Sequence, residues 1–467
     1  MNRNYVVEDI NNYGHTLTKE IARGGQGAVY RTQNSNIAVK LVFDRNNMDY
    51  SKDISENAKY DFLRMLPLPE NINITLPQVT LRKYEGYTMT LLDDMRSFES
   101  VFAYDFNFES DYTNEWIDSL RSSSEECAKD FTQYIVTGGI RRRLEAYYKC
   151  AEILAMLHSN GLVYCDLSAN NIFISEEASK AVWLIDADNI NFQRYTLKNG
   201  GYYTPGYAAP EIIKGKGSSF YSDCYSFAIA LFWNLTWNHP FIGAMLDEGF
   251  DDDFADDSQD KAYSGEYPWI MDDEDDSNHL GDSAKGMPVE MVVSPKLMKY
   301  FDRTFCTDGK TKRMTRPTMY EWANALAEEI DFTIRCPKCH MDYSAHDSKV
   351  CPWCDNEPIT VGVTSYRHGK KFWSFIHEVI DDEEVSIPLR IIEAAKSSNI
   401  DKTLLYMKKA ADGYVIYDMN EEYDFRIETE KQGSFSAYGE VVIPQKCLIK
   451  ATHIRTHSEV IIEVEVL

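Results

Sequence analysis

An ordered set of two carboxylates and one amide lies in the middle of the chain. Asp166 and Asn171 are five residues apart in the segment 163–174, and Asp186 ends the apolar stretch that follows. A carboxylate such as Asp166 can orient a hydroxyl group and accept its proton, while the oxygens of Asn171 and Asp186 suit magnesium held on a nucleotide. Each residue alone is well explained as a turn or cap residue, but the ordered set favours phosphoryl transfer.

A glycine-rich segment and a lysine near the N-terminus could bind phosphate groups. Gly24, Gly25 and Gly27 lie between two predicted strands, where backbone N–H groups can approach phosphates closely. Glycine-rich hairpins are common, so this loop alone is weak support. Lys40, however, ends the next apolar strand and would place its ammonium group against a polyphosphate.

Four of the ten cysteines form two C-x-x-C pairs. Cys336 and Cys339 are separated from Cys351 and Cys354 by eleven residues. Two such pairs can place four thiolates tetrahedrally around Zn²⁺ in a closed, structural site. Because the N-terminus shows no apolar export segment, we favour a zinc site and free thiols elsewhere over disulfides or a redox pair.

The predicted elements that would position these residues divide the chain into four domains. A small β-rich lobe is followed by a mostly helical lobe with an acidic insert, then by a cysteine-rich module and a strand-rich tail. The tail suits docking of a partner protein. The expected bounds are 1–92, 93–332 with the insert 246–290, 333–358 and 359–467.

Charge and hydropathy narrow the class of protein. The 467 residues include 48 Lys and Arg against 74 Asp and Glu, a net charge of −26. This sign argues against a nucleic-acid partner, and no apolar run approaches the roughly 20 residues of a membrane span. We therefore expect a cytoplasmic protein. The basic run Arg141–Arg143 is interpreted as the solvated start of a helix over 141–158.

Over half of the net charge comes from one stretch. Residues 247–282 hold 15 acidic residues and one lysine. We expect this stretch to be mobile, apart from a docked Tyr267–Ile270, because it has few apolar residues to bury. Its negative potential favours a basic protein substrate, and the alternative is a solvated loop without a partner.

Taken in order, these motifs resemble those of eukaryotic-type (Hanks-type) protein kinases over about residues 16–330. The segment TPGYAAPE (204–211) and the helical regions 222–241 and 316–326 extend the match. The resemblance implies an α+β chain with a two-lobed protein-kinase fold, followed by a zinc ribbon and a mostly-β C-terminal domain. It also implies a protein serine/threonine kinase that uses ATP and Mg²⁺ to transfer the γ-phosphoryl group to a protein hydroxyl.

The resemblance assigns roles to single residues. Lys40 would bind the α- and β-phosphates and pair with Glu56 on the next helix. Asp223 would brace the catalytic loop, and Arg316 would pair with Glu211. The catalytic residues would be Asp166, Lys40, Asn171 and Asp186, of which the last two would hold magnesium. The nucleotide contacts would be Ala22, Gly24, Gly25, Gly27, Val29, Ala38, Lys40, Glu56, Met89, Thr90, Leu92, Asn171 and Asp186.

Several residues depart from the family's pattern. Ala22 replaces the first loop glycine, Tyr164 and Cys165 replace the histidine and arginine of the catalytic loop, Ser168 replaces its lysine, and Asp188 replaces the glycine of the D-F-G turn. The base and metal ligands are kept, so we predict an active kinase. The alternatives are a nucleotide-binding pseudokinase scaffold and an adaptor that acts through the zinc ribbon and the C-terminal domain.

The departures also resemble one branch of these kinases. The turn DADNINFQ (186–193), the TPGYAAPE segment and the insert are similar to bacterial kinases of the tellurite-resistance-associated type, which often carry a C-terminal zinc ribbon. Residues 411–418 faintly resemble a forkhead-associated domain. The serine-histidine pattern of that domain is absent from the sequence, so we expect only a docking partner for the tail.

Overall fold

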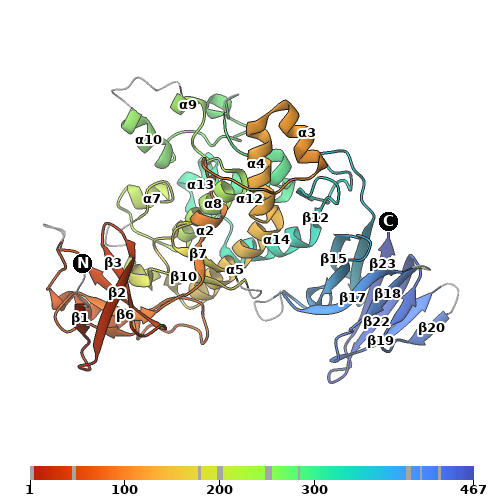
Figure 1. The fold of residues 1–467 in the computed structure, drawn as a ribbon, viewed down its shortest axis with the longest axis horizontal. Coiled ribbons are helices and arrows are strands. Elements are labelled where there is room, and N and C mark those ends of the chain that lie inside the picture. The colour runs from red at the N-terminus through yellow and green to blue at the C-terminus, as the bar shows by residue number, and fades with distance from the viewer. Residues whose placement is uncertain are drawn as a thin grey trace.

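The computed structural model describes residues 5–44, 49–176, 180–196, 203–247, 255–281, 284–395, 401–410, 413–429 and 433–467. A β-rich lobe lies at the left of Figure 1, a helical lobe in the centre, and a strand-rich domain at the right. None of the helices in these ranges is long and apolar enough to cross a membrane.

The N-terminal lobe is built on a six-stranded antiparallel sheet with the strand order β1-β2-β3-β4-β6-β5. Its small core gathers alternating apolar residues such as Val39 and Leu41, because successive side chains of a strand point to opposite faces. The bounds are β1 Tyr5–Glu8, β2 Gly14–Arg23, β3 Gly27–Thr32, β4 Ile37–Val42, η1 Ile54–Asn57, α1 Ala58–Leu63, β5 Val79–Thr80 and β6 Gly86–Thr90.

The helical lobe surrounds α5 (Gly139–Ser159), which buries Leu144, Tyr147 and Leu154 at helical spacing. Helices α8 and α14 pack against it and begin at capping boxes formed by Ser219 and Thr318. Its strands are β7 Met95–Ser97, β8 Leu162–Val163, β9 Ile172–Ser175, β10 Val182–Leu184 and β11 Asn191–Phe192. Its other helices are α2 Phe98–Phe102, α3 Glu115–Ser123, α4 Glu125–Val136, η2 Ala187–Asn189, α6 Gln193–Thr196, α7 Pro210–Ile213, α8 Phe220–Thr236, α9 Ala244–Asp247, α10 Ala255–Tyr263, η3 Asp276–Asn278, α11 Val289–Val292, α12 Pro295–Phe305, α13 Thr307–Thr311, η4 Arg313–Thr315 and α14 Met319–Phe332.

The prediction that the basic run Arg141–Arg143 forms a solvated start to helix α5 is wrong. Arg143 is fully buried, and its guanidinium donates to the backbone carbonyls of Asn234, Gly139 and Phe102. Arg141 is also turned inward and pairs with Glu378 at 3.1 Å. Burial is tolerated because these groups find acceptors, most of which lie far away in the sequence.

The acidic insert is only partly as predicted. Trp269 and Ile270 are buried in the helical lobe, which confirms the docked segment. The expectation of mobility covers too much, because Ala255–Tyr263 forms helix α10 and Asn278 donates to the carbonyls of Phe241 and Pro268. Residues 248–254, which include four of the acidic residues, lie outside the described part of the chain.

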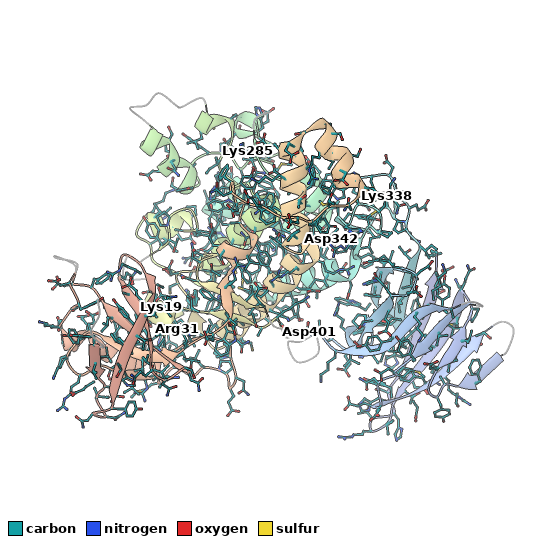
Figure 2. The ribbon with its side chains drawn as sticks, in the orientation of Figure 1. Lys19, Arg31, Lys285, Lys338, Asp342 and Asp401 are labelled. Carbon is teal, nitrogen blue, oxygen red and sulfur yellow. The ribbon has the colours of Figure 1, made fainter. Side chains whose placement is uncertain are left out.

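The cysteine-rich hairpin joins β12 Thr333–Arg335 to β13 Asp342–Ser344 and lies against the helical lobe. Asp342, labelled in Figure 2, accepts a hydrogen bond from the backbone N–H of Arg141 at 2.9 Å. The ring of Trp353 meets Phe131 of α4 at a centroid distance of 5.2 Å. The cysteine-rich module, which contains this hairpin and Trp353, is therefore packed on helices α4 and α5.

The C-terminal domain is a β-sandwich with its own core. A six-stranded sheet has the order β15-β14-β23-β22-β19-β20, and a four-stranded sheet has the order β16-β17-β18-β21. The bounds are β14 Thr360–Arg367, β15 Lys370–Glu378, β16 Glu384–Pro388, η5 Leu389–Ile391, β17 Thr403–Ala410, β18 Gly413–Tyr417, β19 Tyr423–Thr429, β20 Gly433–Ser436, β21 Val441–Ile443, β22 Lys446–His453 and β23 Glu459–Val466.

Buried polar contacts attach the sandwich to the last helix of the helical lobe. Asp331 of α14 is fully buried and accepts hydrogen bonds from Arg390 Nε at 2.8 Å and from Trp373 Nε1 at 2.6 Å. Together with the Arg141–Glu378 pair, these contacts join strand β15 and turn η5 to helices α5 and α14. A buried carboxylate with fixed donors cannot be exposed or repacked cheaply, so the attachment is firm.

Candidate active site

A cavity of about 600 Å³ lies between the N-terminal sheet and the helical lobe. Its size falls in the range of small-molecule sites. Twelve of the thirteen predicted nucleotide contacts line it, and Glu56 does not. Sequence reasoning missed further lining residues. Most lie within two residues of a predicted one, and Thr75 and Ser97 come from segments without one: Ile21, Arg23, Gln26, Thr75, Tyr87, Leu91, Ser97, Asn170, Phe173 and Ile185.

The glycines of the loop occur at their positions for different structural reasons. A side chain at Gly24 or Gly25 would meet no neighbour within 4 Å, so these positions leave space at the mouth of the cavity. A Cβ at Gly27 would lie 2.3 Å from the carbonyl oxygen of Leu41. Gly27 is therefore required by the close packing of β3 on β4, whatever the cavity binds.

Lys40 is the central cation of the site. It lies on β4, and its Nζ forms ion pairs with Asp186 and, at 2.7 Å, with Asp188. Burial disfavours its charged form, but the charges of Asp188 and Asp186 outweigh this effect and raise the pKa of Lys40. The ammonium group is thus charged and surrounded by carboxylates.

The predicted ion pair between Lys40 and Glu56 is not formed. Glu56 is exposed on the 3-10 turn η1, and Lys40 pairs with two other carboxylates. The reason is the register of this segment, whose buried face carries Asn57 and Tyr60. The Asn57 side chain donates to the carbonyl of Leu81 at 2.9 Å, which turns Glu56 toward solvent.

Asp166 lies half-buried in the predicted catalytic loop, within the segment 163–174, and faces a threonine. Its Oδ1 accepts hydrogen bonds from the backbone N–H of Thr204 at 3.0 Å and from the Thr204 hydroxyl at 2.9 Å. Burial raises the pKa of Asp166, although the bonds from Thr204 oppose the shift. Asn171 donates from its side chain to the backbone carbonyl of Asp166 at 2.9 Å, which places the two predicted residues together.

Buried Asp223 braces the catalytic loop, as the sequence predicted. Its two carboxylate oxygens accept from the backbone N–H groups of Tyr164 at 2.8 Å and Cys165 at 3.0 Å. His158 of α5 adds a third contact at 3.0 Å. Cys165 has a φ of 80°, a strained value for a residue with a side chain, and the two hydrogen bonds help to hold it.

The predicted pair between Arg316 and Glu211 is confirmed. Arg316 is buried, and its two terminal nitrogens donate to the two oxygens of Glu211 at 2.7 and 2.9 Å. The pair ties the end of the TPGYAAPE segment to the start of the last helix of the lobe. Bidentate geometry of this kind is the strong form of such a contact.

The four predicted thiolates converge. Their sulfur atoms lie within 4.8 Å of one another, and three of the four cysteines are buried: Cys336, Cys339, Cys351 and Cys354. The pairs Cys336–Cys354 and Cys339–Cys351 have sulfur separations of 3.6 Å, too long for disulfide bonds. The donor set of four sulfurs fits Zn²⁺.

Comparison with known proteins finds similarity to protein kinases. Residues 124–322 match the family model of the protein kinase domain. The chain is 32% identical over 103 residues to the serine/threonine-protein kinase mos of Gallus gallus, which covers 21% of this chain and 29% of that protein. It is 41% identical over 73 residues to the serine/threonine-protein kinase PknG of Mycolicibacterium smegmatis, which covers 16% of this chain and 9% of that protein.

A further bacterial relative is the serine/threonine-protein kinase AfsK of Streptomyces coelicolor, 33% identical over 95 residues, with 20% of this chain and 12% of that protein covered. The chain spans less than a third of the length of each of these relatives. A solved structure of vaccinia related kinase 3 is similar with a TM-score of 0.44 and 16% identity, over 70% of this chain and 91% of that one. The family match and the two-lobed architecture confirm the predicted fold class.

Proposed function

We propose that this protein is a serine/threonine kinase that transfers the γ-phosphoryl group of ATP, with Mg²⁺, to a protein hydroxyl. The observation that carries the proposal is the contact between Asp166 and Thr204. An aliphatic hydroxyl donates to Asp166 at 2.9 Å, beside a cavity of nucleotide size. A substrate serine or threonine that took the place of the Thr204 hydroxyl would meet the same carboxylate.

The other groups of the site suit the remaining tasks. Lys40 offers a charged ammonium group to phosphates, and apolar residues of the sheet would cover the base. Asp186 and the side-chain oxygen of Asn171 are hard oxygen donors at the edge of the cavity, as magnesium requires. When bound, the metal would supply charge neutralisation on the phosphates. Asp166, with its raised pKa, would accept the hydroxyl proton.

The decisive experiment compares two isosteric variants. Asp166→Asn and Asp186→Asn should each abolish transfer from radiolabelled ATP to protein. Only Asp186→Asn should weaken magnesium-dependent nucleotide binding in a thermal-shift assay, because Asp166 faces the hydroxyl and Asp186 the metal. A wild-type protein that binds nucleotide without any transfer would instead be the predicted pseudokinase scaffold, and one that binds none would be an adaptor.

Finer features of the proposal concern the rest of the chain. The four cysteines would hold a structural Zn²⁺ in a ribbon, as in the tellurite-resistance-associated branch, and the sandwich would dock a partner protein. The acidic insert favours a basic substrate, and the negative net charge disfavours nucleic acid. We assign the protein to the cytoplasm. The proposed domains are 1–92, 93–332, 333–358 and 359–467.

A further inference from the structure

Asp188 is held at both carboxylate oxygens by residues of two neighbouring strands. Its Oδ2 lies 2.7 Å from Lys40 Nζ, and its Oδ1 accepts a hydrogen bond from the Tyr87 hydroxyl. Lys40 of β4 and Tyr87 of β6 are register partners in the sheet, and both are buried. The ring of Tyr60 packs on Tyr87 at 4.6 Å, which limits its movement. Asp188 thus links the turn after β10 to strands β4 and β6 of the N-terminal sheet.

The two carboxylates that touch Lys40 differ in their surroundings. The Asp186 side chain is 36% exposed and lines the cavity, where it can turn to a ligand. The Asp188 side chain is 9% exposed and is not among the residues that line the cavity. A group with both oxygens engaged and little access to the cavity is poorly placed to take a metal. Asp188 is therefore well placed to keep its contact with Lys40 when Asp186 turns to a ligand.

Glu56, the expected partner of Lys40, cannot fill this role as the chain is arranged. It is exposed on η1, and the inward face of the segment carries Asn57 and Tyr60 instead. The side chain of Asn57 is fixed by three backbone groups, since it also accepts from the N–H of Gly86 at 3.0 Å. Bringing Glu56 to Lys40 would require breaking these bonds and moving Tyr60.

We propose that Asp188 is the positioning residue that holds Lys40 toward the nucleotide phosphates, in place of Glu56. The inference rests on the proposed ATP site and deepens it. It follows that the lysine is placed by the turn after β10 and by Tyr87, so its placement does not depend on the Glu56 carboxylate. Asp188, which stands at the glycine position of the D-F-G turn, then contributes to the site by holding Lys40.

The test measures binding rather than turnover. Asp188→Asn should weaken binding of ATP in EDTA about tenfold, because a charge-assisted contact that orders the lysine is lost. Binding of adenosine, which has no phosphates for Lys40 to meet, should change less than twofold. Tyr87→Phe, which frees one oxygen of Asp188, should give a smaller loss for ATP alone. Glu56→Gln is the matched rival variant and should leave both affinities within twofold.

Two further comparisons separate positioning from other roles. In a Lys40→Met background, Asp188→Asn should weaken ATP binding no further, because there is no lysine to position. The strengthening of ATP binding by Mg²⁺ should survive Asp188→Asn and be lost in Asp186→Asn.

Four outcomes would overturn the inference: equal losses for ATP and adenosine, unchanged ATP binding, additive losses with Lys40→Met, or loss of the magnesium effect in Asp188→Asn. A loss in Glu56→Gln as large as that in Asp188→Asn would overturn it too. If Asp188→Asn does not fold, Tyr87→Phe and the Lys40→Met double variant decide the question. A wild-type protein that binds adenosine and ATP equally in EDTA and Mg²⁺ would refute the proposed function itself, and the inference with it.

Discussion

The hydroxyl of Tyr164 donates a hydrogen bond to the backbone carbonyl of Ile185. This contact links the predicted catalytic loop, two residues before Asp166, to the segment just before Asp186. Tyr164 is buried, and it stands where the family's pattern has a histidine. A side chain of a different type therefore joins the two loops.

Removing that hydroxyl should loosen the link. Tyr164→Phe keeps the ring and leaves the Ile185 carbonyl without its donor, which should lower the free energy of unfolding by about 1 kcal/mol. Phosphate transfer should fall severalfold, because Asp186 is then less well fixed. Urea unfolding and initial rates would measure both effects. Tyr320→Phe, on an exposed ring, is the control, and an equal change there would contradict the role of the contact.

The Arg316–Glu211 pair should be far more important for stability than a surface pair. Arg316→Met leaves the Glu211 carboxylate buried without a counter-charge, which should cost about 3–5 kcal/mol of unfolding free energy. Arg303→Met, which breaks an exposed pair with Glu321 at 3.1 Å, should cost less than about 1 kcal/mol. Denaturant unfolding of both variants tests the contrast, and similar losses would refute it.

Acid should destabilise the helical lobe through His239. Its Nε2 donates to the Gly206 carbonyl at 2.9 Å and its Nδ1 accepts from the Phe241 N–H at 3.3 Å, so the ring is neutral. Burial lowers the pKa of His239 from 6.5 to about 4. Between these pH values His239 is protonated in the unfolded chain and neutral in the folded chain. The free energy of unfolding therefore falls as the pH falls.

The expected size of this effect is about 2 kcal/mol between pH 7 and pH 5, from 1.4 kcal/mol per pH unit below 6.5. Urea unfolding at several pH values would measure it. His239→Gln should flatten the pH dependence by that amount, whereas His457→Gln, at an exposed position, should not. Parallel slopes for wild type and His239→Gln would show that other groups dominate.

The protein should purify with about one zinc ion per chain, as a four-cysteine site implies. Cys336→Ser should lose the metal and make the hairpin sensitive to protease, while the stabilisation by ATP persists, because the cavity lies in the other lobes. Elemental analysis and limited proteolysis would measure this. Cys127→Ser, which changes an exposed cysteine that is not part of the cluster, should keep its zinc. A zinc-free wild-type protein would contradict the prediction.

The sequence predicted well what depends on local spacing. Asp166 and Asn171 come together because five residues of loop determine their separation, and the C-x-x-C pairs converge for the same reason. Glu56 could not be assigned correctly, because the side of the segment that faces the sheet is decided by Asn57 and its distant carbonyl partners. Arg143 was misjudged for a related reason, since its acceptors lie up to 91 residues away.

The firm attachment at Asp331 has a consequence for whatever the sandwich holds. A module on a flexible linker offers its cargo at an average concentration that depends on linker length. Here Arg390 and Trp373 leave no such freedom, and the strands of the sandwich form a rigid arm. Under the proposed function, a protein bound to the sandwich would be held at one distance and one angle from Asp166. The position of its exposed hydroxyls relative to the sandwich would then decide which of them is phosphorylated.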